Sequence, residues 1–152
     1  MSVEMINGAR TSFGPRDAEA KVGASVITLG AKKQLKVPVK FDELPEHIEG
    51  DVTGVALPAN ALITAVYAVP ALEEFADGTS YDVNMVQDDG TLIAAVATAT
   101  LAEMNSGAEV TITTPTVGAD VAYLEVAETG TFTAGIGCIL IEYIEQYTML
   151  NA

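Results

Sequence analysis

The chain has 152 residues, of which 49% are hydrophobic, and a formal net charge of −14. This length is typical of a single domain, and the hydrophobic content excludes an intrinsically disordered chain. No apolar run approaches the roughly 18 residues of a membrane helix, and the N-terminal segment has neither an early positive cluster nor an apolar stretch. We therefore expect no membrane partner and no signal peptide. The lone Cys138 excludes an intramolecular disulfide.

Charge is divided unequally along the chain. The first forty residues hold seven basic residues and three acids, whereas the remaining 112 hold eighteen acids and no Lys or Arg. Such an acidic body repels nucleic acid, so we expect no nucleic-acid partner. The basic segment is either a chance feature of an acidic soluble protein or an element that docks on an acidic surface. The candidate partner-binding residues are Arg10, Arg16, Lys21, Lys32, Lys33, Lys36 and Lys40.

The N-terminal part of the sequence predicts an arm followed by an edge strand. Residues 1–20 are polar and glycine-punctuated, which indicates an extended arm ahead of a domain spanning 21–152. Residues 34–41 alternate between apolar and polar side chains, as in a half-buried strand. Pro38 cannot donate to a β-ladder and lysines discourage further pairing, so this strand is expected at a sheet edge.

The rest of the chain predicts several short strands separated by turns. Their spacing favours an antiparallel sandwich or barrel over a βαβ fold. The segment 92–104 mixes Ala with Val and Thr, and we predict a short helical turn that leads into a strand. The final strand is apolar on both faces and is expected mid-sheet or in an interface. The expected strands cover residues 52–57, 61–69, 81–86, 110–113, 122–127 and 134–147.

Residues capable of catalysis are scarce. His47 is the only histidine, lies in an acidic loop and is expected to be solvated. Gly135-Ile136-Gly137 precedes no helix, which argues against a dinucleotide-binding loop. Paired carboxylates occur, but without Trp and with 6% aromatic residues there is little material for a sugar-stacking platform. We therefore predict a protein that is not an enzyme, with no catalytic, cofactor or metal site.

Acidic turn residues leave one alternative of a different class, a calcium- or carbohydrate-binding β-sandwich module. Carboxylates that converge in turns are suitable calcium ligands, although solvated turn acids are more common and no EF-hand loop is present. Cys138, within an apolar strand, is expected to be an inert buried thiol. The turn acids in question are Asp77, Asp82, Asp88, Asp89 and Asp120.

Two strand patterns carry a resemblance to a known family. One is the turn Leu57-Pro-Ala-Asn-Ala61 leading into a strand that ends at Val69, and the other is the Ala134-Gly-led strand that ends near Glu142-Tyr143. In this order they resemble the head decoration, or cement, proteins of tailed bacteriophages. The resemblance covers about 90 of the 152 residues and leaves out the basic N-terminal segment.

The resemblance implies a fold, a partner and a location. The fold would be a jelly-roll-like antiparallel β-sandwich, here preceded by the N-terminal arm. The protein would form a homo-oligomer, a dimer or a trimer, that bridges major capsid protein subunits. It would reside on the outer surface of the virion after assembly in the host cytoplasm. A tail or head-fibre component is a second structural alternative.

Overall fold

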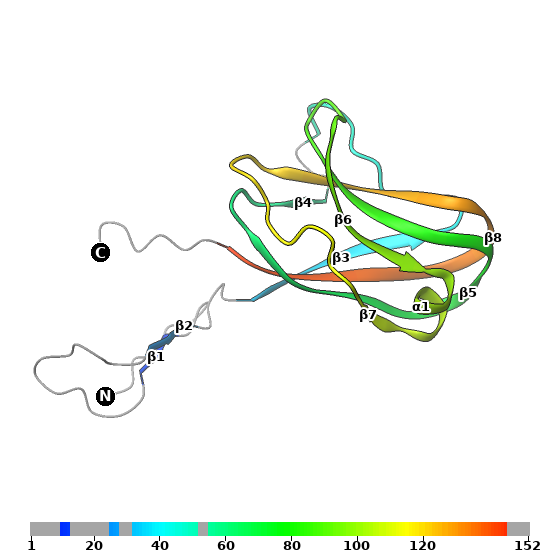
Figure 1. Ribbon diagram of the computed structural model, residues 1–152, viewed down its shortest axis with the longest axis horizontal. Helices are drawn as coiled ribbons and strands as arrows, with labels where there is room; N and C mark the ends of the chain where they lie inside the picture. Colours follow the sequence, from blue (N-terminus) through cyan, green and yellow to red (C-terminus); the bar gives the residue numbers. More distant parts are fainter. Residues whose placement is uncertain (1–9, 13–24, 28–31, 52–54, 146–152) are drawn as a thin grey trace, which may run out of the picture.

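The computed structural model describes residues 10–12, 25–27, 32–51 and 55–145 (Figure 1). This part of the chain consists mainly of antiparallel strands with one short helix, which confirms the predicted all-β class. The jelly-roll connectivity remains a prediction. The elements are β1 (Arg10–Ser12), β2 (Ser25–Ile27), β3 (Lys33–Lys40), β4 (Ala56–Leu57), β5 (Leu62–Val86), β6 (Leu92–Thr100), α1 (Leu101–Ser106), β7 (Ala108–Val110) and β8 (Ala122–Ile144).

Two long antiparallel strands organise the domain. β5 and β8 pair from Leu62 opposite Ile144 to Val86 opposite Tyr123, with several register shifts in between. The second half of β8 also pairs with β3 and the first half of β5 with β7; we call this group the β3 layer. The first half of β8 pairs with β4 and the second half of β5 with β6; we call this group the β6 layer. Figure 1 shows β8 turning around one end of the domain from one layer into the other.

The bend shared by β5 and β8 is packed by aromatic rings. Phe75 lies edge-on to Tyr81 and Phe132, with ring centroids 5.4 and 6.0 Å away, and the latter two rings stack at 4.1 Å. Gly135 has φ 134°, and a Cβ there would lie 2.0 Å from the Phe75 ring. A Cβ on Gly78 would likewise lie 2.1 Å from Phe132. The glycines therefore bring the backbone against the rings and let the strands continue through the bend.

These bends correct the predicted strand boundaries. The strands expected at 61–69 and 81–86 are parts of β5, and those expected at 122–127 and 134–147 are parts of β8. The sequence predicts connections for the polar and glycine-containing segments between them. These segments stay extended because the bend of β5 pairs with the bend of β8, and both pack on the rings of Phe75, Tyr81 and Phe132.

Segment 92–104 also differs from its prediction, because the strand comes first and the helix second. Pairing with β5 keeps the Ala-rich part extended as β6. The helix begins after Thr100, whose hydroxyl accepts from the Glu103 backbone while the Glu103 carboxylate accepts from the Thr100 N–H. Asn105 then accepts from Phe75 N–H at 2.7 Å and donates to Phe75 C=O at 3.0 Å, which ties α1 to the bend of β5.

The core lies between the two layers. β3 contributes Val37 and Val39, β8 contributes Ile139 and Ile141, and all four are buried. The position of β3 at the end of the strand order confirms the predicted edge strand. Burial raises the pKa of Tyr81 to about 12, with a smaller contribution from Glu128.

The predicted arm, residues 1–20, lies largely outside the described residues. Arg10–Ser12 forms β1, which pairs with β2 in a two-stranded ladder separate from the main sheet. Because β2 lies at 25–27, this ladder spans the boundary predicted at residue 20.

Candidate functional site

The edge strand β3 gathers the basic residues whose side chains are described. Lys36 and Lys40 are exposed and, together with Gln34 and Pro38, face away from the core. Lys33 contacts Glu145 at 2.9 Å, and this hydrogen bond raises the pKa of the lysine. Lys40 lies 3.4 Å from Asp42. Within the described ranges no acid lies at ion-pair distance from Lys36.

The remaining candidate basic residues fall outside this geometry. Lys32 is exposed just before β3. Arg10 is the first residue of β1, and its side chain is not described. Arg16 and Lys21 lie outside the described residues. The structure therefore brings together Lys32, Lys33, Lys36 and Lys40, four of the seven predicted partner-binding residues.

The backbone of β3 is open along its outer edge. Phe41 N–H donates to Gly135 C=O on β8 at 3.1 Å. Because backbone groups in an antiparallel strand alternate in direction, those of Gln34 and Lys36 point away from β8, where no described strand pairs with them. Pro38 has no N–H to offer at this edge. The edge thus offers few free backbone donors, and its positive charge is partly offset by Glu145 beside Lys33 and Asp42 beside Lys40.

An open groove of about 600 Å³ lies where β3 meets the 43–46 loop. Its lining includes the apolar residues Pro38, Leu44 and Ile136. Lys40 is the one basic residue in the lining, which also contains Glu43 and Glu46. The groove extends the basic edge toward the outer side of β8.

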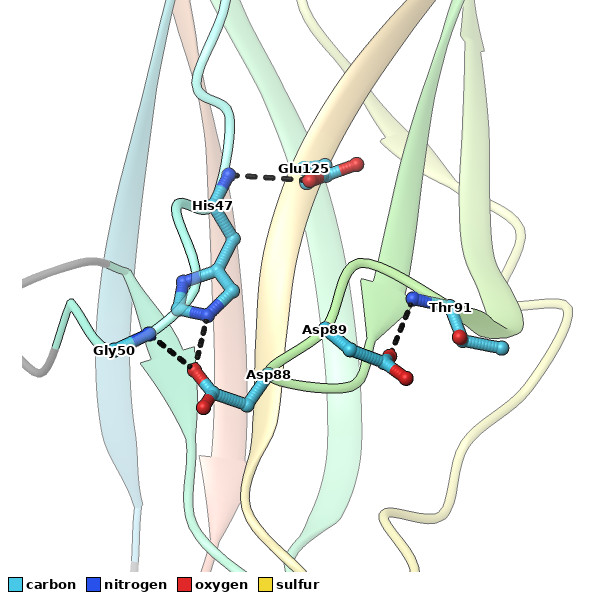
Figure 2. Close-up of polar contacts among 6 residues, drawn as sticks. All are labelled: His47, Gly50, Asp88, Asp89, Thr91 and Glu125. Carbon is cyan, nitrogen blue, oxygen red and sulfur yellow. Dashed lines mark hydrogen bonds and ion pairs between the residues drawn. The ribbon is translucent and has the colours of Figure 1, made fainter.

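His47 is buried rather than solvated, contrary to its prediction (Figure 2). Its ring stacks on Tyr123 with centroids 3.7 Å apart and an interplanar angle of 14°. Nε2 lies 2.8 Å from Asp88 Oδ1, and the His47 N–H donates to the Glu125 carboxylate at 3.2 Å. Gly50 N–H also donates to Asp88 Oδ1, at 3.0 Å. These contacts fasten the 42–51 loop against the β6 layer.

The electrostatics of this loop centre on Asp88. The hydrogen bond from Gly50 N–H, followed by the bond with His47, lowers the pKa of the Asp88 carboxyl. Asp88 and Tyr123 also border an open pocket of about 490 Å³. In the described part of the chain His47 Nδ1 has no hydrogen-bond partner, and the ring bonds to no hydroxyl or thiol, so it lacks the partner that nucleophilic catalysis requires. The contacts of His47 are those of a structural tie.

Of the turn acids in the calcium alternative, Asp88 and Asp120 border the same pocket, whereas Asp77 and Asp82 lie on β5. Asp77 accepts a hydrogen bond from Thr133, Asp82 from Thr98, and Asp89 from Thr91 N–H. Asp88 accepts from Gly50 N–H. These bonds occupy carboxylate oxygens that a calcium ion would need. Across 32–51 and 55–145 no group of three or more His, Cys, Asp or Glu side chains is placed to hold a metal ion. Nothing in this geometry favours calcium over the solvated-acid interpretation.

Cys138 is half-buried on the outer side of β8, which corrects the expected buried thiol. The alternation of β8 places Ile139 and Ile141 in the core and leaves Cys138 and Leu140 on the opposite face. The apolar character of both faces was visible in the sequence, and the outer one is left partly open.

Comparison with protein-family models, curated proteins and solved structures returned no significant match. No helix among the described residues is long and apolar enough to cross a membrane.

Proposed function

We propose that this chain is a structural protein of a tailed-phage particle that decorates the head and stabilises it by bridging major capsid subunits. In this role it acts as a homo-oligomer on the outer surface of the virion, after assembly in the host cytoplasm. It uses no cofactor and has no enzymatic activity.

The observation that carries this proposal is the separation of charge in the fold. The described lysines gather on and beside one edge strand, whereas residues 41–152 contain no Lys or Arg at all. An acidic body discourages adsorption to DNA, while a basic edge favours docking on an acidic protein surface. Many modest contacts repeated around a closed shell add up to a large stabilisation.

Further support comes from the all-β fold and the resemblance of the two strand patterns. The Leu57–Val69 pattern corresponds to the entry into β5, and the Ala134–Ile144 pattern to the second half of β8. Residues 62–69 and 138–144 of these patterns pair with each other in the β3 layer, whereas Leu57 lies in β4 of the β6 layer.

Quantitative mass spectrometry of virions from the phage that encodes the chain tests the proposal. We expect hundreds of copies per particle, in proportion to the major capsid protein. Absence from the particle would overturn the proposal, and a few copies per particle would favour the tail or head-fibre alternative.

Binding to heads stripped of this chain tests the role of the basic segment. Replacing Arg10, Arg16 and Lys21 by Gln should weaken binding, and added salt should weaken the wild type because exposed charge pairs are screened. A control with the exposed residues Gln87, Thr111 and Thr131 changed to Glu makes the net charge equally more negative without touching the basic segment. Equal binding by wild type and the basic-segment variant would overturn the docking role.

A further inference from the structure

The outer face of the β3 layer carries an apolar strip. Residues paired across β3, β8 and β5 form neighbouring rows, with Lys36 beside Leu140 and Tyr67, Pro38 beside Cys138 and Val69, and Lys40 beside Ile136 and Glu73. Each row continues an outward-facing set of side chains. The strip consists of Pro38, Tyr67, Val69, Ile136, Cys138 and Leu140, of which Pro38 is exposed and the others are half-buried.

The corresponding face of the β6 layer is polar at its paired middle positions, and its exposed apolar side chains, Leu92, Ile93 and Val121, lie at one end. There Asn84 pairs with Glu125, and Asp82 pairs with Ala127 on one side and with Thr98 on the other. The Thr98 hydroxyl donates to the Asp82 carboxylate. His47 covers part of this face by stacking on Tyr123. The apolar character of the β3 layer is therefore not a general property of the outer surface.

Opposite charges flank the apolar strip. Lys36 and Lys40 lie on its β3 side, and Glu109 of β7 and Glu73 of β5 lie on the other. Glu109 is paired with Tyr67, which places it in the same row as Lys36. Each of these four charged side chains is exposed.

We propose that this face binds a second copy of the chain about a two-fold axis parallel to the strands. Such an axis passes between β8 and β5, so β3 of each copy lies over β7 of the other copy. Each row of side chains in one copy then faces the same row in the other copy. Lys36 then faces the partner's Glu109, and Lys40 lies toward the partner's Glu73. Stacked sheets are about 10 Å apart, a gap that a Lys and a Glu side chain span together.

The charge pattern selects this occupant and this symmetry. Edge-to-edge pairing of two β3 strands would bring the lysines of both copies together, with only Glu145 beside Lys33 and Asp42 beside Lys40 to offset them among the described residues. Like charges opposite each other disfavour such pairing. Face-to-face packing instead matches both charged flanks in one self-complementary contact, which is what a two-fold interface requires. A closed dimer follows, and a trimer does not.

Charge exchange within one row provides the test. Sedimentation equilibrium of the full chain should give a dimer of the 15.8 kDa subunit. Lys36→Glu and Glu109→Lys should each raise the dissociation constant about tenfold or more, because each variant places like charges opposite each other at two symmetric positions. The double variant should return to within about threefold of the wild type. Glu128→Lys, an exposed charge reversal in the β6 layer, is the matched control and should leave dimerisation unchanged.

The lone cysteine offers a second readout at the interface itself. The rate at which Cys138 reacts with a thiol reagent should fall as protein concentration rises through the dimerisation range. A monomer at all concentrations, a trimer, a double variant no better than the single variants, or a concentration-independent thiol rate would each overturn the proposal.

This inference rests on the self-association included in the proposed function and specifies its surface and symmetry. It assigns Lys36 and Lys40 to the dimer, so docking on the capsid falls to the basic residues that precede β3. The experiment uses the free protein without capsid, so a monomer in solution would overturn the dimer and leave virion proteomics to decide head decoration. Conversely, a confirmed dimer that is missing from virions would overturn only the decoration role.

Discussion

The two halves of β8 present the same kind of inner surface and opposite kinds of outer surface. Leu124 and Val126 in the first half face the core, as do Ile139 and Ile141 in the second. On the outer side, the first half carries Glu125 in a polar face and the second half carries the apolar strip. The inner residues of both halves stabilise the domain core. The difference in polarity between the two outer sides is therefore not needed for the core, and we attribute it to different contacts of the two surfaces.

A substitution at the bend between the two halves of β8 should cause the largest decrease in the free energy of unfolding. Gly135→Ala places a Cβ against the Phe75 ring at a backbone φ of 134°. Combined overpacking and backbone strain should cost about 2–6 kcal/mol of unfolding free energy. Urea denaturation measures the loss, and Gly118→Ala, where no atom lies within 4 Å of the added Cβ, is the control. Equal stability of the two variants would contradict this account of the bend.

Two consecutive residues of β8 separate its inner and outer roles. Ile139→Ala removes a fully buried side chain and should cost about 2–5 kcal/mol. Leu140→Ala, half-buried on the outer face, should cost the monomer less than Ile139→Ala and should weaken dimerisation. Denaturation below the dimerisation range, combined with sedimentation, measures both quantities. A monomer destabilised equally by both changes would place Leu140 functionally in the core.

The tie between α1 and the bend of β5 should have an intermediate effect. Asn105→Ala leaves the Phe75 N–H and C=O without their side-chain partners, which should cost about 1–3 kcal/mol. The neighbouring Ser106→Ala, which removes an exposed hydroxyl bonded to Ala102 C=O, serves as the control and should change stability little. A similar loss in both variants would indicate a general effect on the short helix.

The smallest effect should be a change in how the unfolding free energy depends on pH, caused by Asp88 in the β6 layer. Contacts with Gly50 and His47 lower the pKa of Asp88 below its ordinary value of 3.8. The folded state therefore favours the carboxylate, and this stabilisation is present above about pH 4 and is lost as the pH falls through the lowered pKa. Asp88→Asn should flatten the acid side of the stability profile, whereas Asp120→Asn on a nearby loop should retain the wild-type shape. Identical profiles for all three proteins would argue against the tie.

The sequence was most informative where the signal is local. Alternation in residues 34–41 and the position of Pro38 sufficed to predict an edge strand, and the charge division indicated where its lysines would gather. Continuity of β5 and β8 was not predictable in this way, because glycines and polar residues at the bends also occur in ordinary turns. Only contact with Phe75, many residues away from Gly135, shows why the chain continues there.

The burial of His47 was missed for a related reason. Its partners Asp88 and Tyr123 are remote in sequence, and an acidic loop gives no local sign that it will fold against a sheet. The sequence places Asp88 and Asp89 in a turn, but nothing in these residues indicates that a histidine lies opposite. The half-open position of Cys138 likewise depends on β8 lying between β3 and β5, which a single strand pattern does not specify.

Because β3 pairs with β8, it cannot join its sheet until the ribosome has made the second half of β8. Lys40 is made 96 residues before its partner Ile136, a delay of roughly 5–20 s at ordinary translation rates. During this interval β3 has no β8 to pair with, so its backbone is open to pairing with the same segment of a second nascent chain. Its lysines and Pro38 oppose pairing between these nascent strands, so the residues that later mark the edge of the finished domain also protect it before it is complete.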